Sequence, residues 1–306
     1  MFSYLIRRIL ITIPLLLGVI FIVTISFDLI PGDPAALILG EFATEEAVAE
    51  LRGRLGLDRP LLIRYADTVI SAAQGDLGRS LNDRRPVVTI LSETFPYTAQ
   101  LAVAAIVLVL VFGIPLGLLA AMRPGSILDN VIRVVSLAGL SMPVFWTGLV
   151  FMVIFAVELN WVPVSGTGTW KHLVLPAVTL ALPSLAVIAR MTRSTVLEVL
   201  REDFIRTARA KGVSERTLLL KHMLRNAMIP VVTVLGLQLG QMLGGAVLTE
   251  TVFAWPGVGR LTVFAIFNRD YVLMQGVVMV LASVYVVVNL LVDLSYGLFD
   301  PRVRYA

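Results

Sequence analysis

The sequence contains no cysteine and only two histidines, His172 and His222, among its 306 residues. The absence of cysteine excludes disulfide bonds, thiol catalysis and cysteine-ligated metal sites. The two histidines lie far apart in the sequence, so a metal site built on histidine is not expected. We therefore assign no catalytic residue and no metal ligand.

Charged residues are also scarce. Asp, Glu, Lys and Arg make up 15% of the chain, whereas an average soluble protein has about 25%, and the mean hydropathy is +0.88. Six windows contain no charged residue: 9–27, 94–122, 134–157, 172–189, 226–249 and 271–292. All but the fourth exceed 18 residues, and a helix needs about 20 to cross the hydrocarbon core. Because backbone groups in lipid must be satisfied internally, we predict an all-α integral membrane protein with six transmembrane helices.

The distribution of Lys and Arg orients these helices. With the N-terminus inside, residues 1–8, 123–133, 190–225 and the tail after Asp293 hold 15 of the 25 Lys and Arg, and the two short outer loops hold three. Basic residues favour the cytoplasmic side of short loops, so both termini are expected in the cytoplasm. The net charge of +4 reflects this asymmetry and is no argument for nucleic-acid binding.

The expected organisation has an N-terminal transmembrane helix at 1–29, an extracytoplasmic segment at 30–95 and a five-helix core at 96–299 with a cytoplasmic loop at 193–225. A cytoplasmic tail follows at 300–306. The extracytoplasmic segment opens with the turn signal PGDP at 31–34, and its apolar spacing predicts helices over 45–55 and 61–73. Two compatible interpretations stay open: a small cap resting on the bilayer, or a surface that docks an external binding protein.

Residues 190–225, here called the basic segment, contain nine Lys or Arg and four acids. Each charge at a bilayer centre costs roughly 2.5–3.5 kcal/mol, so this segment lies in water. The stretch 194–210 is compatible with one helix, and Gly212 is expected to allow a turn that a Cβ atom would obstruct. Ser214 then fits a helix N-cap, with Val213 and Leu218 spaced as a hydrophobic staple. Anchoring alone needs fewer charges and no hinged helices, so we interpret the segment as a rigid docking element for another protein.

The fifth window carries a helix-packing signal and two amides. Gly236, Gly240 and Gly244 recur at every fourth position and form a smooth stripe for close helix approach. Gln238 and Gln241 lie away from that stripe, and amides in a membrane span are costly unless they face partners or a watery cavity. We assign them to a translocation path, with hydrogen bonding between helices as the alternative.

Two weaker patterns concern packing and anchoring. Gly113 and Gly117 in the second window are interpreted as a packing pair. The four tryptophans are interpreted as membrane-interface anchors: Trp146, Trp161, Trp170 and Trp255.

The run FIRTARAKGVSERTLLLKHMLRNAMIP resembles the cytoplasmic signature of ABC-transporter permeases, in the branch that imports dipeptides, oligopeptides, nickel or glutathione. The motifs PGDP, LGLDRPL, GDLGRS, ETVFAWPGVGRL (250–261) and DPRVR (300–304) appear in the order expected of that branch, so the resemblance covers the whole chain. Aligned on Gly212, the glutamate of the general permease motif falls on Arg206 and its two alanines on Thr207 and Ala208. This departure fits the peptide and nickel branch.

The resemblance implies a type I ABC importer permease fold with a small extracytoplasmic α-helical segment, in the cytoplasmic membrane of a bacterium or archaeon. It implies that a loop helix inserts into a cleft of an ATPase subunit. The residues that it assigns to this coupling are Arg206, Thr207, Ala208, Arg209, Ala210, Lys211, Gly212, Val213, Ser214 and Glu215.

The same resemblance implies partners: a second homologous permease subunit, two ATPase subunits, an extracytoplasmic substrate-binding protein and membrane lipid, with no nucleic acid. The chain has no G-x-x-x-x-G-K-[ST] loop, so ATP and Mg are expected on the partner ATPase subunits and no cofactor on this chain. The expected role is a non-catalytic subunit that forms half of the path for peptides, glutathione or a nickel complex.

Two other function classes were weighed. A secondary transporter would need ionisable residues buried near mid-membrane or an inverted repeat, and the apolar windows show neither. An intramembrane enzyme would need a catalytic motif such as S-x-x-K, H-E-x-x-H or paired central aspartates, and the sequence contains none of these. Both are disfavoured.

Overall fold

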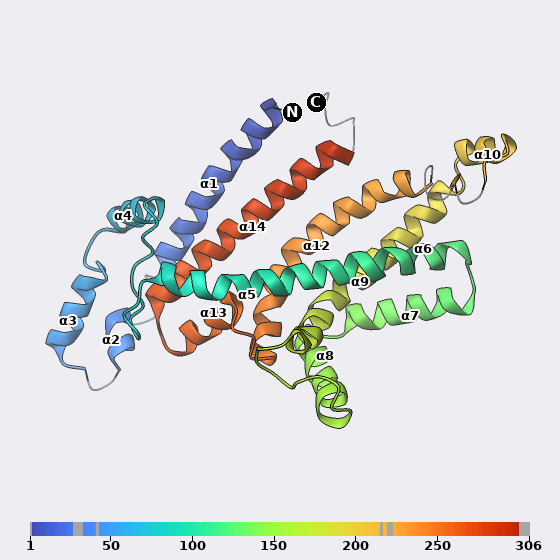
Figure 1. Ribbon diagram of the computed structural model, residues 1–306. Coiled ribbons are helices and arrows are strands. Elements are labelled where there is room, and N and C mark those ends of the chain that lie inside the picture. The colour runs from blue at the N-terminus through green and yellow to red at the C-terminus, as the bar shows by residue number, and fades with distance from the viewer. Residues whose placement is uncertain (1, 27–32, 41–42, 215–216, 219–222, 300–306) are drawn as a thin grey trace. The chain divides into compact units, whose positions relative to one another are not determined.

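A computed structural model describes residues 2–26, 33–40, 43–214, 217–218 and 223–299 (Figure 1). Throughout these ranges the regular elements are helices, and the only extended pairing is an isolated bridge between Arg79 and Pro86. The all-α prediction is therefore confirmed. The chain divides into two compact units, one containing 97–256 with 288–306 and the other containing 2–96 with 257–287. Two of the boundaries fall within the long helices α5 (Val87–Leu108) and α14 (Tyr271–Phe299), and the third falls between Pro256 and Gly257.

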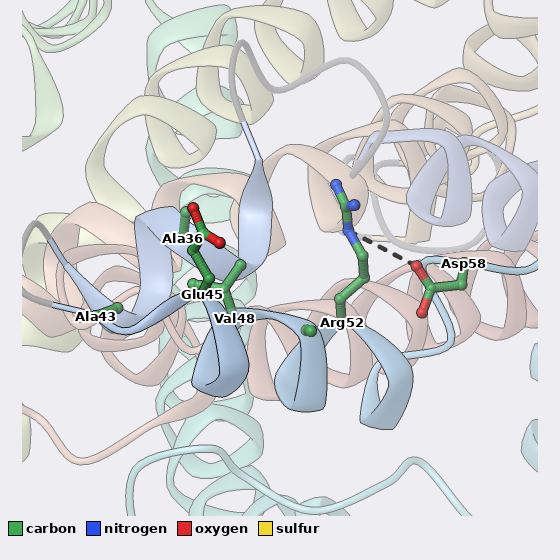
Figure 2. A pocket seen from close by; sticks show the side chains of 7 residues that line it. Ala36, Ala43, Glu45, Val48, Arg52 and Asp58 are labelled. Atoms are coloured by element: carbon green, nitrogen blue, oxygen red, sulfur yellow. Dashed lines mark ion pairs between the residues drawn. The ribbon is translucent and has the colours of Figure 1, made fainter.

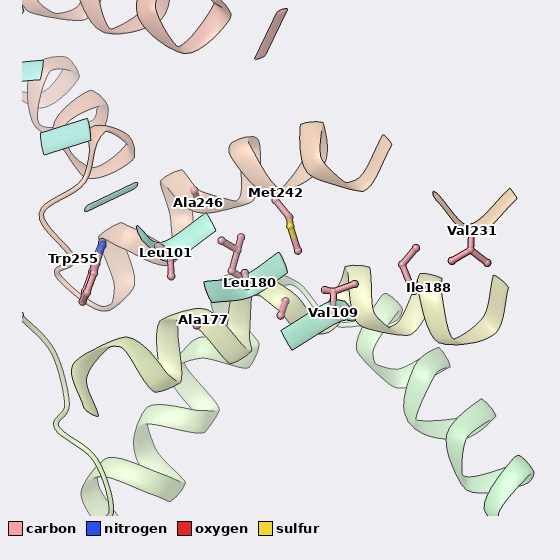
Figure 3. Packing of buried hydrophobic residues seen from close by; sticks show 11 residues of the cluster. Leu101, Val109, Ala177, Leu180, Ile188, Val231, Met242, Ala246 and Trp255 are labelled. Carbon is pink, nitrogen blue, oxygen red and sulfur yellow. The ribbon is translucent and has the colours of Figure 1, made fainter. Parts of the chain in front are cut away.

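In the first unit, α9 (Trp170–Val199) is the central helix. It packs against α6 (Ile114–Met122), α7 (Ile127–Ser141), α8 (Val144–Phe151) and α12 (Leu224–Val252). A short π-helical stretch, η1 (Val109–Gly113), leads from α5 into α6. Figure 3 shows the core between these helices, with Leu101 and Val109 facing Leu180, Ile188 and Met242. Helix α9 continues through its two prolines, so the shortest charge-free window does form a long helix.

Close helix approach in this unit depends on the glycine pair of the second window. A Cβ atom on Gly117 would lie 2.6 Å from the Cβ of Thr192 and would also collide with the carbonyl of Ala189. At Gly113 the added atom would lie 3.3 Å from Ile188. The packing role predicted for Gly113 and Gly117 is confirmed, because both let α6 and its π-helical entry lie directly on α9.

The third charge-free window, 134–157, does not form one straight helix as predicted. The chain bends by 111° between helix α7 and the pair formed by α8 and η2 (Met152–Glu158). The break falls at Met142, which precedes Pro143 and adopts an extended conformation with φ −89° and ψ 133°. The proline ring disfavours helical geometry at the residue before it, which explains the break.

Four described helical stretches are long and apolar enough to cross a membrane: Val87–Met122, Trp170–Val199, Asn226–Val252 and Tyr271–Val292. The bent pair would be a fifth if it crosses as one span. Helix α1 (Phe2–Ser26) contains a further apolar stretch, Leu10–Ile25. The number of six transmembrane helices stays a prediction.

The second unit contains α1, α2 (Pro34–Leu39), α3 (Glu45–Arg54), α4 (Leu61–Ala73) and α13 (Val258–Phe267). The helices predicted over 45–55 and 61–73 are confirmed. Side-chain caps explain two of the helix starts, because Asp33 accepts from the amide of Ala35 and Thr44 accepts from the amide of Ala47. A core of apolar side chains then joins the start of α5 to α13 and α14: Val87, Ile90, Leu91, Val258, Ala265, Leu273 and Val277.

The GDLGRS motif is attached to the start of α14 by one buried carboxylate. Asp270 caps α14 by accepting from the amide of Leu273 at 3.0 Å, and it also accepts from the amide of Leu81 at 3.1 Å and from the hydroxyl of Ser80. Gly78 has a φ of +82° and packs against Val272. This motif therefore has a structural role, which is to hold the loop before α5 against α14.

A hollow of about 440 Å³ lies on α2 and α3, and Figure 2 shows the side chains that line it. Its charged residues include Glu45, Arg52 and Asp58. The Arg52 guanidinium lies 3.1 Å from Asp33 and 3.8 Å from Asp58, so its charge is already balanced by two carboxylates. These ion pairs hold α2, α3 and the following turn together, and we assign no binding role to the hollow.

Candidate functional site

The basic segment contains a turn between α9 and α10 (Asp203–Ala210) that the sequence did not predict. The stretch 194–210 was expected to be one helix, but α9 ends at Val199 and α10 starts after a turn. Glu202 has the extended conformation of an N-cap, with φ −68° and ψ 146°. The prediction of a continuous helix is wrong because tertiary packing overrides the local helical preference. The turn allows the apolar face of α10 to pack against the membrane helices.

The inner face of α10 rests on a small apolar core. Ile205 is fully buried there, and Ala208 packs against its edge. The buried members come from the ends of α6, α9 and α12 as well as from the basic segment: Ala121, Val196, Ile205, Leu218, Met223 and Ala227. Fully burying a side chain the size of isoleucine contributes about 1.5–3 kcal/mol. Ile205 therefore connects α10 by direct packing to the ends of α6, α9 and α12.

Helix α10 ends in a Schellman motif centred on Gly212. The amide of Gly212 donates to the carbonyl of Arg209 at 2.9 Å, and the amide of Val213 donates to the carbonyl of Ala208 at 3.2 Å. Gly212 adopts a φ of +76°, the left-handed conformation that this motif requires. No atom of the described residues lies within 4 Å of the place a Cβ atom would take. The prediction that Gly212 allows this turn is confirmed, and a Cβ atom would be strained there by the left-handed backbone rather than by contact with a neighbour.

The residues after Gly212 start a new turn, as predicted. The Ser214 hydroxyl accepts from the amide of Thr217 at 3.4 Å, and the Ser214 carbonyl accepts from the amide of Leu218 at 2.9 Å. Val213 and Leu218 belong to the same small core, so the N-cap and the staple are both present. Glu215, the last residue assigned to coupling, lies outside the described residues.

The outer face of the basic segment is open to solvent. On α10 and the turn after it, the exposed cationic side chains include Arg206, Arg209 and Lys211. Arg206 lies 3.5 Å from Asp203, but both side chains are highly exposed, and such a pair contributes little stability. Phe204 is 41% exposed beside them, and the sequence analysis missed it. The signal was an aromatic residue in an otherwise charged stretch. A surface aromatic beside arginines is typical of protein interfaces.

A buried ion pair holds the start of α7 to the end of α9, and the sequence analysis missed it too. The Arg193 guanidinium binds both oxygens of the Asp129 carboxylate, at 2.6 and 2.9 Å, and Asp129 is fully buried. The amide of Gly125 donates to the same carboxylate at 2.9 Å. Arg193 lies within two turns of the end of α9, so the pair fixes the helix from which the basic segment emerges.

The two glutamines of α12 have different surroundings. Gln238 is buried, and its side-chain oxygen accepts from the Ser184 hydroxyl of α9 at 2.9 Å. This is the hydrogen bond between helices that was the alternative interpretation. Gln241 is exposed, on the same face as Leu237 and Leu248. The assignment of Gln238 and Gln241 to a translocation path stays a prediction.

The glycine stripe of α12 changes its surroundings along the helix. Gly236 is buried, Gly240 is half-buried and Gly244 is exposed. At Gly244 an added Cβ atom would meet no described atom within 4 Å, whereas at Gly245 it would lie 3.2 Å from Leu180. Close approach to α9 thus involves Gly245, and the packing role of Gly236, Gly240 and Gly244 stays a prediction.

A polar cluster lies at the C-terminal end of α12. Glu250 is fully buried and accepts from the Thr98 hydroxyl at 2.7 Å. Trp255 is also buried: its ring nitrogen donates to the carbonyl of Tyr97 at 2.9 Å, and the two rings meet edge to face. The interpretation of Trp255 as an interface anchor is therefore wrong, while Trp146, Trp161 and Trp170 are exposed.

Within the described ranges, His, Asp and Glu side chains form no cluster of three that could hold a metal ion.

Comparisons with known proteins agree with this arrangement. The family described as binding-protein-dependent transport system inner membrane component matches residues 113–305, and its N-terminal region matches residues 1–102. The chain is 44% identical to the di/tripeptide transport system permease protein of Pseudomonas aeruginosa (strain UCBPP-PA14), over 100% of this chain and 99% of that protein. It is 42% identical to the glutathione transport system permease protein of Salmonella choleraesuis (strain SC-B67), over the full length of both.

Solved structures show the same fold. A chain of the MetNI methionine ABC transporter, in an inward facing conformation, aligns with a TM-score of 0.59 at 20% identity. The alignment covers 69% of this chain and 96% of that chain. At this identity the likeness shows the fold alone.

Proposed function

Since this chain belongs to the family of binding-protein-dependent transport system inner membrane components, we propose that it is the peptide permease of an ATP-driven importer and forms half of its translocation path. The substrate class follows from the relatives, which are named for the transport of di- and tripeptides and of glutathione. Short peptides with free termini are the shared chemistry. A nickel complex is the further substrate that the motif resemblance allows.

The observation that carries this proposal is the construction of α10. Phe204 and Arg206 on its outer face and Lys211 at its C-terminal end are exposed to solvent. Ile205 on its inner face is buried in a core shared with α6, α9 and α12. One short helix can therefore bind a soluble partner and move the ends of α6, α9 and α12 together. An importer driven by a separate ATPase requires this kind of connection.

The partners complete the assembly. Two ATPase subunits bind ATP and Mg, and one of them takes α10, with the coupling residues 206–215, into its cleft. A second homologous permease subunit forms the other half of the path, and an extracytoplasmic binding protein delivers the peptide. This chain is the non-catalytic subunit, with both termini in the cytoplasm. Gln241, exposed on α12, faces the path between the two permease subunits.

The test is uptake of a radiolabelled dipeptide into proteoliposomes that contain both permease subunits, the ATPase subunits and the binding protein. Uptake should require ATP inside the vesicles and should survive collapse of ion gradients by an ionophore. Uptake that proceeds without ATP and stops with the ionophore would identify a secondary transporter and overturn the proposal.

A further inference from the structure

Helix α4 has its polar and apolar faces reversed relative to a helix on the surface of a soluble protein. Its exposed face carries Leu62, Ile63 and Ile70, which are 73%, 49% and 55% exposed, whereas Arg64 is only 9% exposed. A surface helix in water places charged residues outward and apolar residues inward. Reversed polarity is expected where the surrounding medium is hydrocarbon.

The inward face of α4 binds the backbone of α1 through polar groups. The Arg64 guanidinium donates to the carbonyl of Thr24 at 3.3 Å, and the Tyr65 hydroxyl donates to the carbonyl of Leu17 at 3.2 Å. The Thr68 hydroxyl donates to the carbonyl of Arg64 within α4 at 2.8 Å. Polar side chains inside a membrane are directed toward protein partners in this way.

These contacts also show how far α4 reaches along α1. Leu17 lies nine residues before the end of α1 at Ser26, which corresponds to roughly 14 Å of helix. The Tyr65 ring packs edge to face on Phe21, with ring centroids 5.5 Å apart. Figure 1 shows α4 beside this end of α1. Helix α4 thus accompanies about two fifths of the length of a helix expected to cross the bilayer.

The apolar face of α4 continues the lipid-facing surface expected of α1. Phe21 and Ile22 of α1 are themselves exposed beside it. The one charged residue on that face of α4, Asp67, is paired with Arg59 at 3.0 Å. Helix α3 differs within the same segment, because it has charged residues at both ends and none of its side chains is buried by the described residues.

We propose that α4 is embedded in the leaflet where α1 ends, with Leu62, Ile63 and Ile70 among the lipid acyl chains and α3 in water above it. The occupant of this face is lipid rather than a protein, because the face is continuous with α1 and carries no unpaired charge among the described residues. The segment between α1 and α5 is then a half-inserted anchor and not a wholly water-exposed domain.

Site-directed spin labelling tests this directly, since the chain has no native cysteine. Leu62→Cys and Ile70→Cys carry the label on α4, and Glu46→Cys, exposed on α3, is the matched control. The complete transporter in proteoliposomes is probed with molecular oxygen, which concentrates in hydrocarbon, and with a water-soluble nickel chelate. Both α4 labels should collide more with oxygen and the Glu46→Cys label more with nickel.

Nickel access at either α4 position equal to that at the control would overturn the proposal, since the face would be in water. Exclusion of both reagents at either position would also overturn it, because a protein subunit would then cover the face. ATP-driven uptake is measured in the same vesicles. Absence of uptake with the unmodified chain would count against the proposed function, while the collision pattern would still report the environment of α4.

Discussion

Helices α4 and α10 are both short, both amphipathic and both packed against longer helices, yet they have opposite polarity. Helix α10 directs Ile205 inward and its cations outward, whereas α4 directs Arg64 inward and Leu62 outward. The difference shows that an amphipathic pattern defines two faces but not the medium around them. Water surrounds the first helix, and by our inference lipid surrounds the second. The predictions below test whether the apolar core beneath α10 couples ATP hydrolysis to transport.

The largest effect is expected at the ion pair between Asp129 and Arg193, which joins the start of α7 to the end of α9. Asp129→Asn removes the charge that pairs with Arg193 and should lower stability by about 3–5 kcal/mol, because a buried charge loses its partner. Thermal unfolding in detergent measures the loss. The matched control is the double variant Asp129→Asn with Arg193→Met, which removes both charges and should recover much of the stability. A double variant no more stable than the single one would contradict this account.

The next effect concerns the core under α10. Ile205→Ala should lower stability by about 2–5 kcal/mol, as large-to-small substitutions in cores do, and should reduce peptide uptake per ATP hydrolysed. Ile127→Ala is the matched control, because Ile127 is 83% exposed at the start of α7. We expect its stability to change by less than about 0.5 kcal/mol. Equal uptake per ATP in the two variants would show that this core does not carry coupling.

The outer face of α10 should affect binding and not folding. Phe204→Ala should weaken binding of the ATPase subunits by more than about 1 kcal/mol, in line with aromatic interface anchors, and leave thermal stability unchanged. Phe145→Ala on α8 is the control, since Phe145 is similarly exposed, at 45%. Pull-down of the ATPase subunits at graded concentrations gives the affinities. Unaltered affinity in Phe204→Ala would remove this residue from the interface.

The smallest effect is expected at the turn after α10. Gly212→Ala imposes left-handed geometry on a residue with a Cβ atom, at a cost of about 1–2 kcal/mol. Gly166→Ala is the control, because Gly166 has a φ of +91° and equally open space among the described residues. Both variants should lose similar stability, but only Gly212→Ala should lower uptake per ATP hydrolysed. If both variants keep normal uptake, the conformation of this turn is not needed for coupling.

The sequence predicted the features that depend on neighbouring residues. The two helices of the outer segment, the glycine turn at Gly212 and the Ser214 cap all follow from local rules of spacing and capping. Several of the features that it missed join distant residues. Arg193 and Asp129 are 64 positions apart, and no local pattern indicates that pairing.

Two misses have different causes. The break at Met142 could have been predicted from Pro143, because the restriction that proline imposes on the preceding residue is local. The turn between α9 and α10 could not, since residues 194–210 are compatible with one helix and only the shared core requires Ile205 to face α6 and α12. Residue type alone likewise does not show whether the Gln238 side chain lines a translocation path or hydrogen-bonds to another helix. The hydrogen bond to Ser184 is a tertiary contact, which no local pattern indicates.

The central claim is that α10 transmits the motion of an ATPase to the membrane helices, and cross-linking tests it most directly. Thr207→Cys places a single thiol on the exposed face of α10, and Glu46→Cys on α3 is the control. In the complete transporter, a short bifunctional reagent should join Thr207→Cys to an ATPase subunit and stop ATP-driven uptake, and it should do neither with Glu46→Cys. A transporting complex in which Thr207→Cys never cross-links to an ATPase subunit, or in which the cross-linked form transports at full rate, would contradict the claim.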